Sequence, residues 1–192
     1  MGIKSGIIHI YNYFKVAFGK IPLCLKKVSY GSNTRIYGKI LVSNHGKITI
    51  GNDFRCNSSQ RSNPVGGPYQ SVLYALNGAE IRIGNNVGIS GTAIIARNLI
   101  SIEDDVLIGS GTCIYDNDFH SLKYDSRNDV SQIKSAPVYI KKGAFIGART
   151  IILKGVTIGN KSVIGAGSVV TKSIPDNQVW AGNPARYIKT IE

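Results

Sequence analysis

Residues 140–175 read IKKGAF-IGARTI-ILKGVT-IGNKSV-IGAGSV-VTKSIP, which is one six-residue unit repeated six times without a gap. Each unit opens on Ile or Val, and its fifth residue is Ala, Thr, Val, Ser or Ile. A six-residue period fits the two-residue alternation of a strand and misses the period of a helix, which is about 3.6 residues. The β-branched residues and the frequent Gly at the second place favour short strands joined by tight corners. The stretch therefore predicts an all-β solenoid, in which each unit buries its apolar side chains against its neighbours.

The charge of the chain is strongly positive and unevenly distributed. The 192 residues include 23 Lys or Arg and 11 Asp or Glu, which gives a net charge of +12, and residues 1–52 contain eight basic residues and no carboxylate. No recognised nucleic-acid motif accompanies this charge, and aromatic residues are not interleaved with the basic ones, so we expect no nucleic-acid partner. The excess favours a polyanionic cofactor and an anionic or membrane-linked acceptor.

Cysteine usage and hydropathy predict where the protein works. Cys24, Cys56 and Cys113 are unevenly spaced and form no CxxC pair, so neither a disulfide framework nor a zinc knuckle is indicated. No signal peptide is recognisable, and no apolar run is long enough to span a membrane. We expect a cytoplasmic protein that is soluble or peripheral to the inner face of the membrane.

The chain divides into three predicted parts: residues 1–29, the repeat region 30–180, and a tail, 181–192. Apolar residues recur at helical spacing in residues 3–18 and predict a short amphipathic helix there. Two roles stay open for this helix. It can cap the first coil of the solenoid, or it can contact a membrane surface together with Lys20, Lys26 and Lys27.

Two segments interrupt the repeat and are predicted to be loops, at about residues 55–79 and 119–137. The first is rich in Gly, Pro, Ser and Asn. The second lies between Ile114 and Ile140, which are 26 positions apart although the hexad pattern is intact on either side. We expect this second segment to be extruded from the coils, and long loops of this kind often carry function.

A candidate acid–base pair lies where the second loop begins. In the hexad that opens at Ile114, Asp118 takes the fifth place, which elsewhere holds a small or apolar inward residue. His120 follows two positions later, so in an extended chain both side chains leave the backbone on the same side. A carboxylate that orients an imidazole is the arrangement that a general base requires. The alternative also stays open that Asp116 and Asp118 cap turns and that His120 is an ordinary loop residue.

The repeat and the sequence AGNPAR at residues 181–186 together resemble the hexapeptide-repeat acyltransferases, and most closely the sugar and polysaccharide O-acetyltransferases. The resemblance implies a left-handed parallel β-helix with three units per coil. It also implies acetyl-CoA as the acyl donor with no metal, and a homotrimer whose active sites lie between two subunits.

The resemblance also implies roles for individual residues. The string at 116–120 is similar to the DxDxH string of the family, which makes His120 the general base, supported by Asp116 or Asp118. Ser90 or a nearby backbone N–H would donate to the oxyanion. The family's pantetheine groove corresponds to the backbone at Ala148 and Ala166, which are one 18-residue coil apart. The implied phosphate and adenine contacts are Thr171, Lys172 and Arg186.

The predicted function is transfer of an acetyl group from acetyl-CoA to a sugar hydroxyl of a capsule-type or lipopolysaccharide-type polysaccharide or its precursor. N-acetylation of a nucleotide-linked amino sugar is an alternative, because it would use the same base and donor. A non-catalytic scaffold is a second alternative. A zinc site like that of the β-helical carbonic anhydrases is not favoured, because the histidines are only His9, His45 and His120, and two of them precede the regular repeat.

Overall fold

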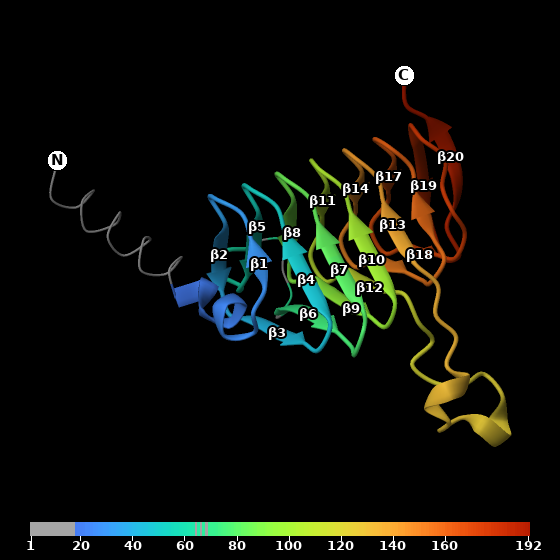
Figure 1. The fold of residues 1–192 in the computed structure, drawn as a ribbon. Coiled ribbons are helices and arrows are strands. Elements are labelled where there is room, and N and C mark those ends of the chain that lie inside the picture. The colour runs from blue at the N-terminus through green and yellow to red at the C-terminus, as the bar shows by residue number, and fades with distance from the viewer. Residues whose placement is uncertain (1–17, 64, 66, 68) are drawn as a thin grey trace, which may run out of the picture.

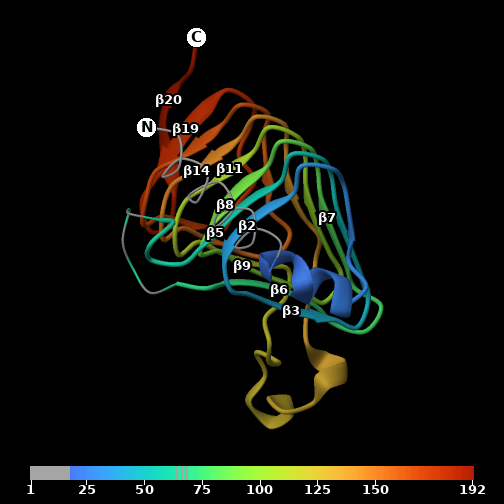
Figure 2. The same ribbon diagram turned by 90° about the vertical axis from the view of Figure 1, so that its left-hand side faces the viewer.

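The structure is a computed structural model, and it describes residues 18–63, 65, 67 and 69–192. Its strands form three sheets, named A, B and C here, that the chain visits in turn. All neighbouring strands run parallel, except for the last pair of sheet B. The sheets enclose one core and give the molecule a three-sided cross-section (Figures 1 and 2). The predicted solenoid of parallel strands is confirmed, and its left-handedness stays a prediction.

The strands are short and stack in sequence order. Sheet A contains β1 (Ser29–Tyr30), β4 (Lys47–Ile50), β7 (Glu80–Ile83), β10 (Leu99–Ile102), β13 (Val138–Ile140) and β16 (Thr157–Ile158). Sheet B contains β2 (Arg35–Gly38), β5 (Arg55–Ser58), β8 (Gly88–Ser90), β11 (Leu107–Ile108), β14 (Phe145–Ile146), β17 (Val163–Ile164), β19 (Gln178–Ala181) and β20 (Arg186–Thr190). Sheet C contains β3 (Ile40–Asn44), β6 (Ser71–Ala75), β9 (Ala93–Ala96), β12 (Cys113–Tyr115), β15 (Ile151–Ile152) and β18 (Val169–Val170).

The hexad positions explain the core. The first residue of each unit points inward, and Ile140, Ile146 and Ile152 are fully buried and stack on the equivalent residues of adjoining coils. The fifth residue also points inward, even where it is polar. Thr150 and Ser168 are buried there, and each donates its hydroxyl to the carbonyl of the Gly three residues earlier. A buried hydroxyl that is hydrogen-bonded in this way costs little, so the core accepts it.

The second place of the hexad is often Gly because adjacent coils approach each other closely at the corners. A Cβ added to Gly147 would lie 2.5 Å from the backbone nitrogen of Ala166 in the next coil. No side chain fits at that distance, so the corner between sheets B and C requires glycine. We call this the B–C corner, and we name the A–B and C–A corners in the same way.

Two loops leave the coils at different corners. Residues 59–70 leave the B–C corner between β5 and β6, and residues 116–137 leave the C–A corner between β12 and β13. The second loop projects far from the body and contains the 3-10 helices η1 (Tyr124–Ser126) and η2 (Val130–Gln132) (Figure 2). Its two ends pair through an antiparallel bridge between Asn117 and Ser135.

The first loop is shorter than the sequence predicts. Residues 55–79 were expected to be loop, but β5 and β6 occupy both sides of it, and the segment 76–79 is an ordinary corner. In β5 the alternation of inward and outward residues is hard to recognise from the sequence, because its inward residues are Cys56 and Ser58 and not the usual Ile or Val. Ser58 is buried because its hydroxyl donates to Lys39 O and accepts from Ser71 N.

The two ends of the solenoid are covered differently. Most of the predicted helix 3–18 lies outside the described residues, but residues 18–25, expected to be mainly connection, are helical and bury Leu23. At the other end the tail folds back on the last coil. There β19 extends sheet B across the expected boundary at residue 180, and β20 pairs antiparallel to it, so the last coil has a covered edge (Figure 1).

Candidate functional site

The structure distributes the sequence-predicted site residues over two corners of the solenoid. Asp116, Asp118 and His120 follow β12 at the C–A corner, and Thr171 and Lys172 follow β18 at the same corner. The remaining residues lie at the B–C corner: Ser90 at the end of β8, Ala148 after β14, Ala166 after β17, and Arg186 at the start of β20. Within one chain these two groups are separated by the width of sheet C.

Asp116 is the buried carboxylate of the 116–120 string. Its side chain has no exposed surface, and its two oxygens accept hydrogen bonds from the backbone nitrogens of Arg97 and Asn98, both at 2.7 Å. Asn117 Nδ2 also donates to Asp116 Oδ1, at 3.1 Å. Backbone N–H groups that converge on a carboxylate compensate its burial. Asp116 therefore fixes the corner between β9 and β10, and it makes no hydrogen bond with His120 in the described part of the chain.

Asp118 is paired with a lysine that the sequence reasoning missed. Lys154 Nζ lies 2.5 Å from Asp118 Oδ1, and both side chains are largely shielded from solvent. The second oxygen, Oδ2, is buried and has no hydrogen-bond partner in the part of the chain that the structure describes. A buried acceptor of this kind is costly unless a further donor reaches it. The Asp118–Lys154 pair thus presents one unfilled acceptor at the base of the extruded loop.

The chain between Asp118 and His120 is not extended, so the expectation that both side chains leave on the same side is wrong. Phe119 has a φ of 61°, and the backbone N–H of His120 donates to Asp118 O at 2.7 Å, which closes a tight turn. Asn117 Oδ1 accepts from the Phe119 N–H and stabilises this turn. His120 is exposed, and its imidazole makes no hydrogen bond or ion pair within residues 18–63, 65, 67 and 69–192.

Aromatic and basic groups surround this turn. The rings of Tyr115 and Phe119 meet edge to face at 5.0 Å between centroids. Burial, and to a lesser extent a hydrogen bond with Cys113, raises the pKa of Tyr115 to about 12, so its phenol stays protonated at neutral pH. Arg97 was also missed by sequence reasoning. Its guanidinium Nη2 donates to the carbonyl of Val130 in η2 at 2.8 Å and ties the loop to the coils.

The B–C corner presents an open backbone edge. Ala148 is half-buried and Ala166 is exposed, and Gly167 N donates to Ala148 O at 2.8 Å, so the two alanines stack in consecutive coils as predicted. Arg186 lies at the same end of sheet B. It pairs with Ala181 of β19, and the Cβ of Ala181 lies next to Gly165, the residue before Ala166. The structure thus brings Ala148, Ala166 and Arg186 together. It leaves Thr171 and Lys172, both exposed, at the other corner.

Ser90 lies at the opposite end of the sheet C strands from His120. Its hydroxyl is 3.4 Å from Asn57 Nδ2, and it borders a shallow depression of about 230 Å³ on sheet B together with Arg55, Leu107 and Phe145. Tyr69 of the first loop packs beside this corner, because a Cβ at Gly91 would lie 2.7 Å from the Tyr69 Cβ. Within one chain Ser90 therefore cannot act on a group that His120 holds.

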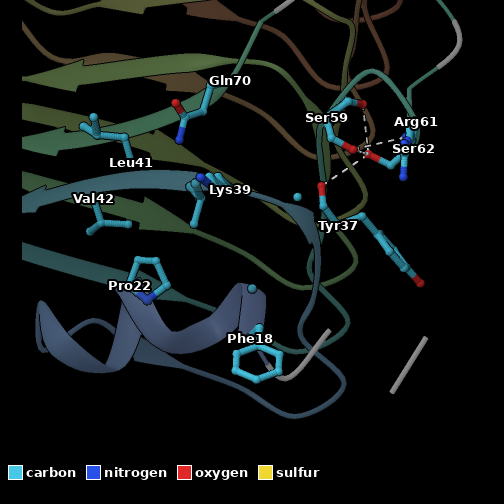
Figure 3. A pocket seen from close by; sticks show the side chains of 13 residues that line it. Phe18, Pro22, Tyr37, Lys39, Leu41, Val42, Ser59, Arg61, Ser62 and Gln70 are labelled. Atoms are coloured by element: carbon cyan, nitrogen blue, oxygen red, sulfur yellow. Dashed lines mark hydrogen bonds between the residues drawn. The ribbon is translucent and has the colours of Figure 1, made fainter. Parts of the chain in front are cut away.

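A cavity with mainly apolar walls lies at neither group of candidate residues. It has a volume of about 1050 Å³ and opens between helical residues 18–25, the first coil and the first loop (Figure 3). Its walls are mainly apolar, with Lys39 and Arg61 among the lining residues. A second cavity of about 510 Å³ lies at the C–A corner below the extruded loop. Within the described residues, no three His, Cys, Asp or Glu side chains gather to hold a metal ion, and no helix could span a membrane.

Comparison with known proteins confirms the resemblance that the repeat predicted. Residues 137–172 match the family described as hexapeptide repeat of succinyl-transferase. Galactoside O-acetyltransferase of Escherichia coli is 38% identical over 120 residues, which are 62% of this chain and 58% of that enzyme. The chain thus spans little more than half the length of this relative.

Two solved structures share most of the coil. One is a variant of AntD, an N-acyltransferase of Bacillus cereus, in complex with dTDP-4-amino-4,6-dideoxyglucose and coenzyme A. It is 29% identical, has a TM-score of 0.66, and covers 85% of this chain and 84% of its own. The other is a hexapeptide-repeat acetyltransferase of Vibrio cholerae complexed with acetyl coenzyme A. It is 28% identical, has a TM-score of 0.56, and covers 80% of this chain and 71% of its own.

Proposed function

We propose that this chain, which carries the hexapeptide repeat and is similar to hexapeptide-repeat acetyltransferases, transfers an acetyl group from acetyl-CoA to a sugar hydroxyl. The carrying observation is the C–A corner, where the exposed imidazole of His120 stands two residues after the half-buried Asp118, whose Oδ2 is buried and has no hydrogen-bond partner among the described residues. This is what a general base and its orienting group require. The fold, with its open backbone edge at the B–C corner, offers a place for the donor.

The proposed reaction is direct transfer without a covalent enzyme intermediate. His120 removes the proton from the acceptor hydroxyl while the hydroxyl oxygen attacks the thioester carbonyl. The tetrahedral intermediate collapses, the C–S bond breaks, and the imidazolium returns its proton to the leaving thiolate. Asp118 Oδ2 would accept the other imidazole N–H after a rotation of His120, and Ser90 or a backbone N–H at the B–C corner would donate to the oxyanion.

The donor is assigned to the B–C corner. The small side chains of Ala148 and Ala166 leave backbone groups accessible to the amides of a pantetheine arm. Arg186 is exposed at the same end of sheet B and would contact a phosphate. Thr171 and Lys172 would contact the adenine and ribose phosphate of the donor only if the C–A corner of another chain lies beside this corner.

A homotrimer would bring the two corners together. The outward residues of sheet C form registered apolar columns: Val72, Ala93, Cys113, Ile151 and Val169 in one, and Tyr74, Ile95 and Tyr115 in the other. A largely apolar sheet face of this kind favours contact with a second copy. If sheet C faces a threefold axis, the C–A corner of one chain lies beside the B–C corner of the next. His120 and Ser90 would then belong to one site.

The acceptor class separates the proposed function from its alternatives. A polysaccharide of the capsule or lipopolysaccharide type, or its precursor, is favoured by the basic chain and by the similarity to galactoside O-acetyltransferase. The similarity to AntD, whose structure holds a dTDP-linked amino sugar, supports the alternative of N-acylation. A non-catalytic solenoid would give neither activity and would leave the acceptor oxygen of Asp118 without a role.

The proposed function is tested by release of coenzyme A with a panel of saccharides and nucleotide-linked amino sugars. We expect turnover with a sugar hydroxyl, and we expect His120→Ala to lower kcat by roughly 10²-fold or more while acetyl-CoA still binds. Lys123→Ala, an exposed change in the same loop, is the matched control. Transfer only to amino sugars would establish the N-acyltransferase. Absence of acetyl-CoA binding would leave only a scaffold.

We also propose a peripheral contact between the first-coil end of the solenoid and the cytoplasmic face of a membrane. Phe18, Ile21 and Leu25 are exposed on the helical residues 18–25, and Lys20, Lys26 and Lys27 lie beside them. Apolar and basic side chains combined in this way bind anionic lipid surfaces. Sedimentation with vesicles that contain phosphatidylglycerol tests this contact, and equal sedimentation with uncharged vesicles would contradict it.

A further inference from the structure

The cavity at the C–A corner lies on the same edge of the solenoid as the candidate base. It is lined by His45, Tyr74, Leu76, Asn77, Arg97 and Val130. These residues come from strand β6 (Tyr74), from the corners of the first three coils and from the extruded loop, whereas Asp116 begins the corner of the fourth coil. Strands stack about 4.8 Å apart, so the corners from His45 to Asp116 span about 14 Å, or roughly three sugar units.

The lining chemistry suits a saccharide. The rings of His45 and Tyr74 lie 6.2 Å apart and are tilted by 50°, so they form an angled aromatic wall. Aromatic faces bind the apolar faces of sugar rings, and the side-chain amide of Asn77 can donate to and accept from hydroxyls. The cavity is thus built from the groups that recognise sugars, and it lies beside the extruded loop through Val130.

The charge of the cavity is positive. No carboxylate lines it, and Arg97 forms no ion pair within the described residues. One guanidinium nitrogen of Arg97 donates to Val130 O, which leaves further N–H groups for a ligand. Asp116 accepts from the backbone nitrogen of Arg97 at 2.7 Å, so the backbone that carries this guanidinium is fixed by the carboxylate that begins the 116–120 string.

From these observations we propose that the groove formed by His45, Tyr74, Asn77 and Arg97 binds the sugar units that flank the acetylated residue, and that the acceptor is an acidic oligosaccharide or polysaccharide. The inference rests on the proposed function and specifies its substrate. A short neutral acceptor would leave the groove empty, whereas a chain of about three units with a carboxylate or phosphate substituent would fill it and neutralise Arg97.

Binding without turnover tests the groove separately from catalysis. The probes are trigalacturonate and the neutral maltotriose, titrated by NMR into the His120→Ala protein without acetyl-CoA. We expect trigalacturonate to bind and maltotriose to bind at least about tenfold more weakly, with the difference decreasing as salt is raised. Equal binding of the two trisaccharides overturns the proposal. So does displacement of trigalacturonate by an equal concentration of inorganic phosphate, because the groove would then be an anion site only.

Variants locate the binding. Arg97→Gln should weaken trigalacturonate binding about tenfold, and Arg97→Lys should restore part of it. Arg82→Gln, on the outward face of sheet A, is the control and should change nothing. Because Arg97 also contacts the loop, His45→Gln provides an independent variant at an exposed position that should weaken binding as well. Unchanged binding in both Arg97→Gln and His45→Gln overturns the proposal.

A kinetic experiment connects the groove to the reaction. Where turnover is found, His45→Gln should raise KM for an acidic oligosaccharide and leave kcat unchanged, because the groove binds the ground state and transition state equally. KM for a single-sugar acceptor should not change. Equal changes in KM for both acceptors would contradict the proposal that the groove binds flanking sugars. A lack of any turnover would contradict only the proposed function and would leave the binding result in place.

Discussion

Asp116 and Asp118 are adjacent acidic residues of one string, but their surroundings give them different tasks. Asp116 accepts two backbone N–H groups and is fully buried, whereas Asp118 pairs with Lys154 and keeps one free acceptor oxygen. The first is a positioning residue for the corner that carries Arg97. The second has an oxygen, Oδ2, that accepts no hydrogen bond from the described residues.

Replacement of Asp116 should therefore affect the fold more than the chemistry. In Asp116→Asn one backbone N–H faces an amide NH₂ group, and a buried donor loses its acceptor, which costs about 2 kcal/mol of unfolding free energy. Urea denaturation measures this loss. We expect the pH profile of kcat to keep its shape, because Asp116 does not contact His120. A displaced profile would instead place Asp116 next to the base.

A double-mutant cycle tests the Asp118–Lys154 pair. Removing either partner from a largely shielded ion pair leaves an uncompensated charge, so Asp118→Asn and Lys154→Met should each destabilise the protein by about 1–2 kcal/mol. The double variant should be less destabilised than the sum of the two single variants, by at least about 0.5 kcal/mol. Additive losses in thermal unfolding would mean that the pair contributes no coupling energy. Activity should fall with Asp118→Asn and should not recover in the double variant.

These residue-level features show what the sequence could and could not predict. The string at 116–120 was found because Asp118 takes a hexad place that should be apolar. The partner Lys154 is 36 positions away and follows β15, which stacks directly on β12, so the two residues meet because their coils are neighbours. The hexad pattern shows which coils are neighbours but not that the Lys154 side chain turns toward Asp118. The direction of His120 was wrong because the positive φ of Phe119 has no signal in a residue that is neither Gly nor Asn.

The element that repeats is a strand followed by a corner, and several corners contain a left-handed residue other than glycine. Lys161 has a φ of 55° and is exposed at the A–B corner. This conformation strains a non-glycine residue by about 1 kcal/mol, and replacement by glycine removes the strain. Glycine also raises the conformational entropy of the unfolded chain, which cancels part of that gain in stability. Lys161→Gly should therefore stabilise the protein by about 0.5 kcal/mol, measured by urea denaturation. Lys161→Val, with a β-branched side chain at the same φ, should destabilise it, and the opposite order would contradict the argument.

At this scale the sequence was most informative where the hexads are regular. Residues 140–175 were predicted as coils, and their inward places match the buried residues of the structure. The prediction failed at β5, because Cys56 and Ser58 fill inward places that the pattern expects to be Ile or Val. A hydroxyl whose hydrogen bonds come from the neighbouring loop can take such a place, and that compensation is not visible in a single hexad.

At the scale of the whole molecule, the proposed function depends on assembly, because one chain holds its candidate base and its candidate donor edge at different corners. His120→Ala removes the base, and Ala166→Trp should block the donor edge, where Ala166 is exposed and a large side chain is tolerated by the fold. Each variant alone should be inactive. Lys142→Trp, exposed at the A–B corner, is the matched control for a bulky substitution and should remain active.

Mixed trimers of the two variants should regain activity. If each site combines the C–A corner of one chain with the B–C corner of the next, every trimer that contains both variants has both groups intact in one of its three sites. Co-expression with two affinity tags, purification of mixed oligomers and measurement of coenzyme A release test this expectation. Sites within single chains would instead give mixed oligomers as inactive as either parent. Recovery near one third of the wild-type activity would require that the apolar face of sheet C brings the chains together, and Ile95→Asp on that face should abolish the recovery while each chain stays folded.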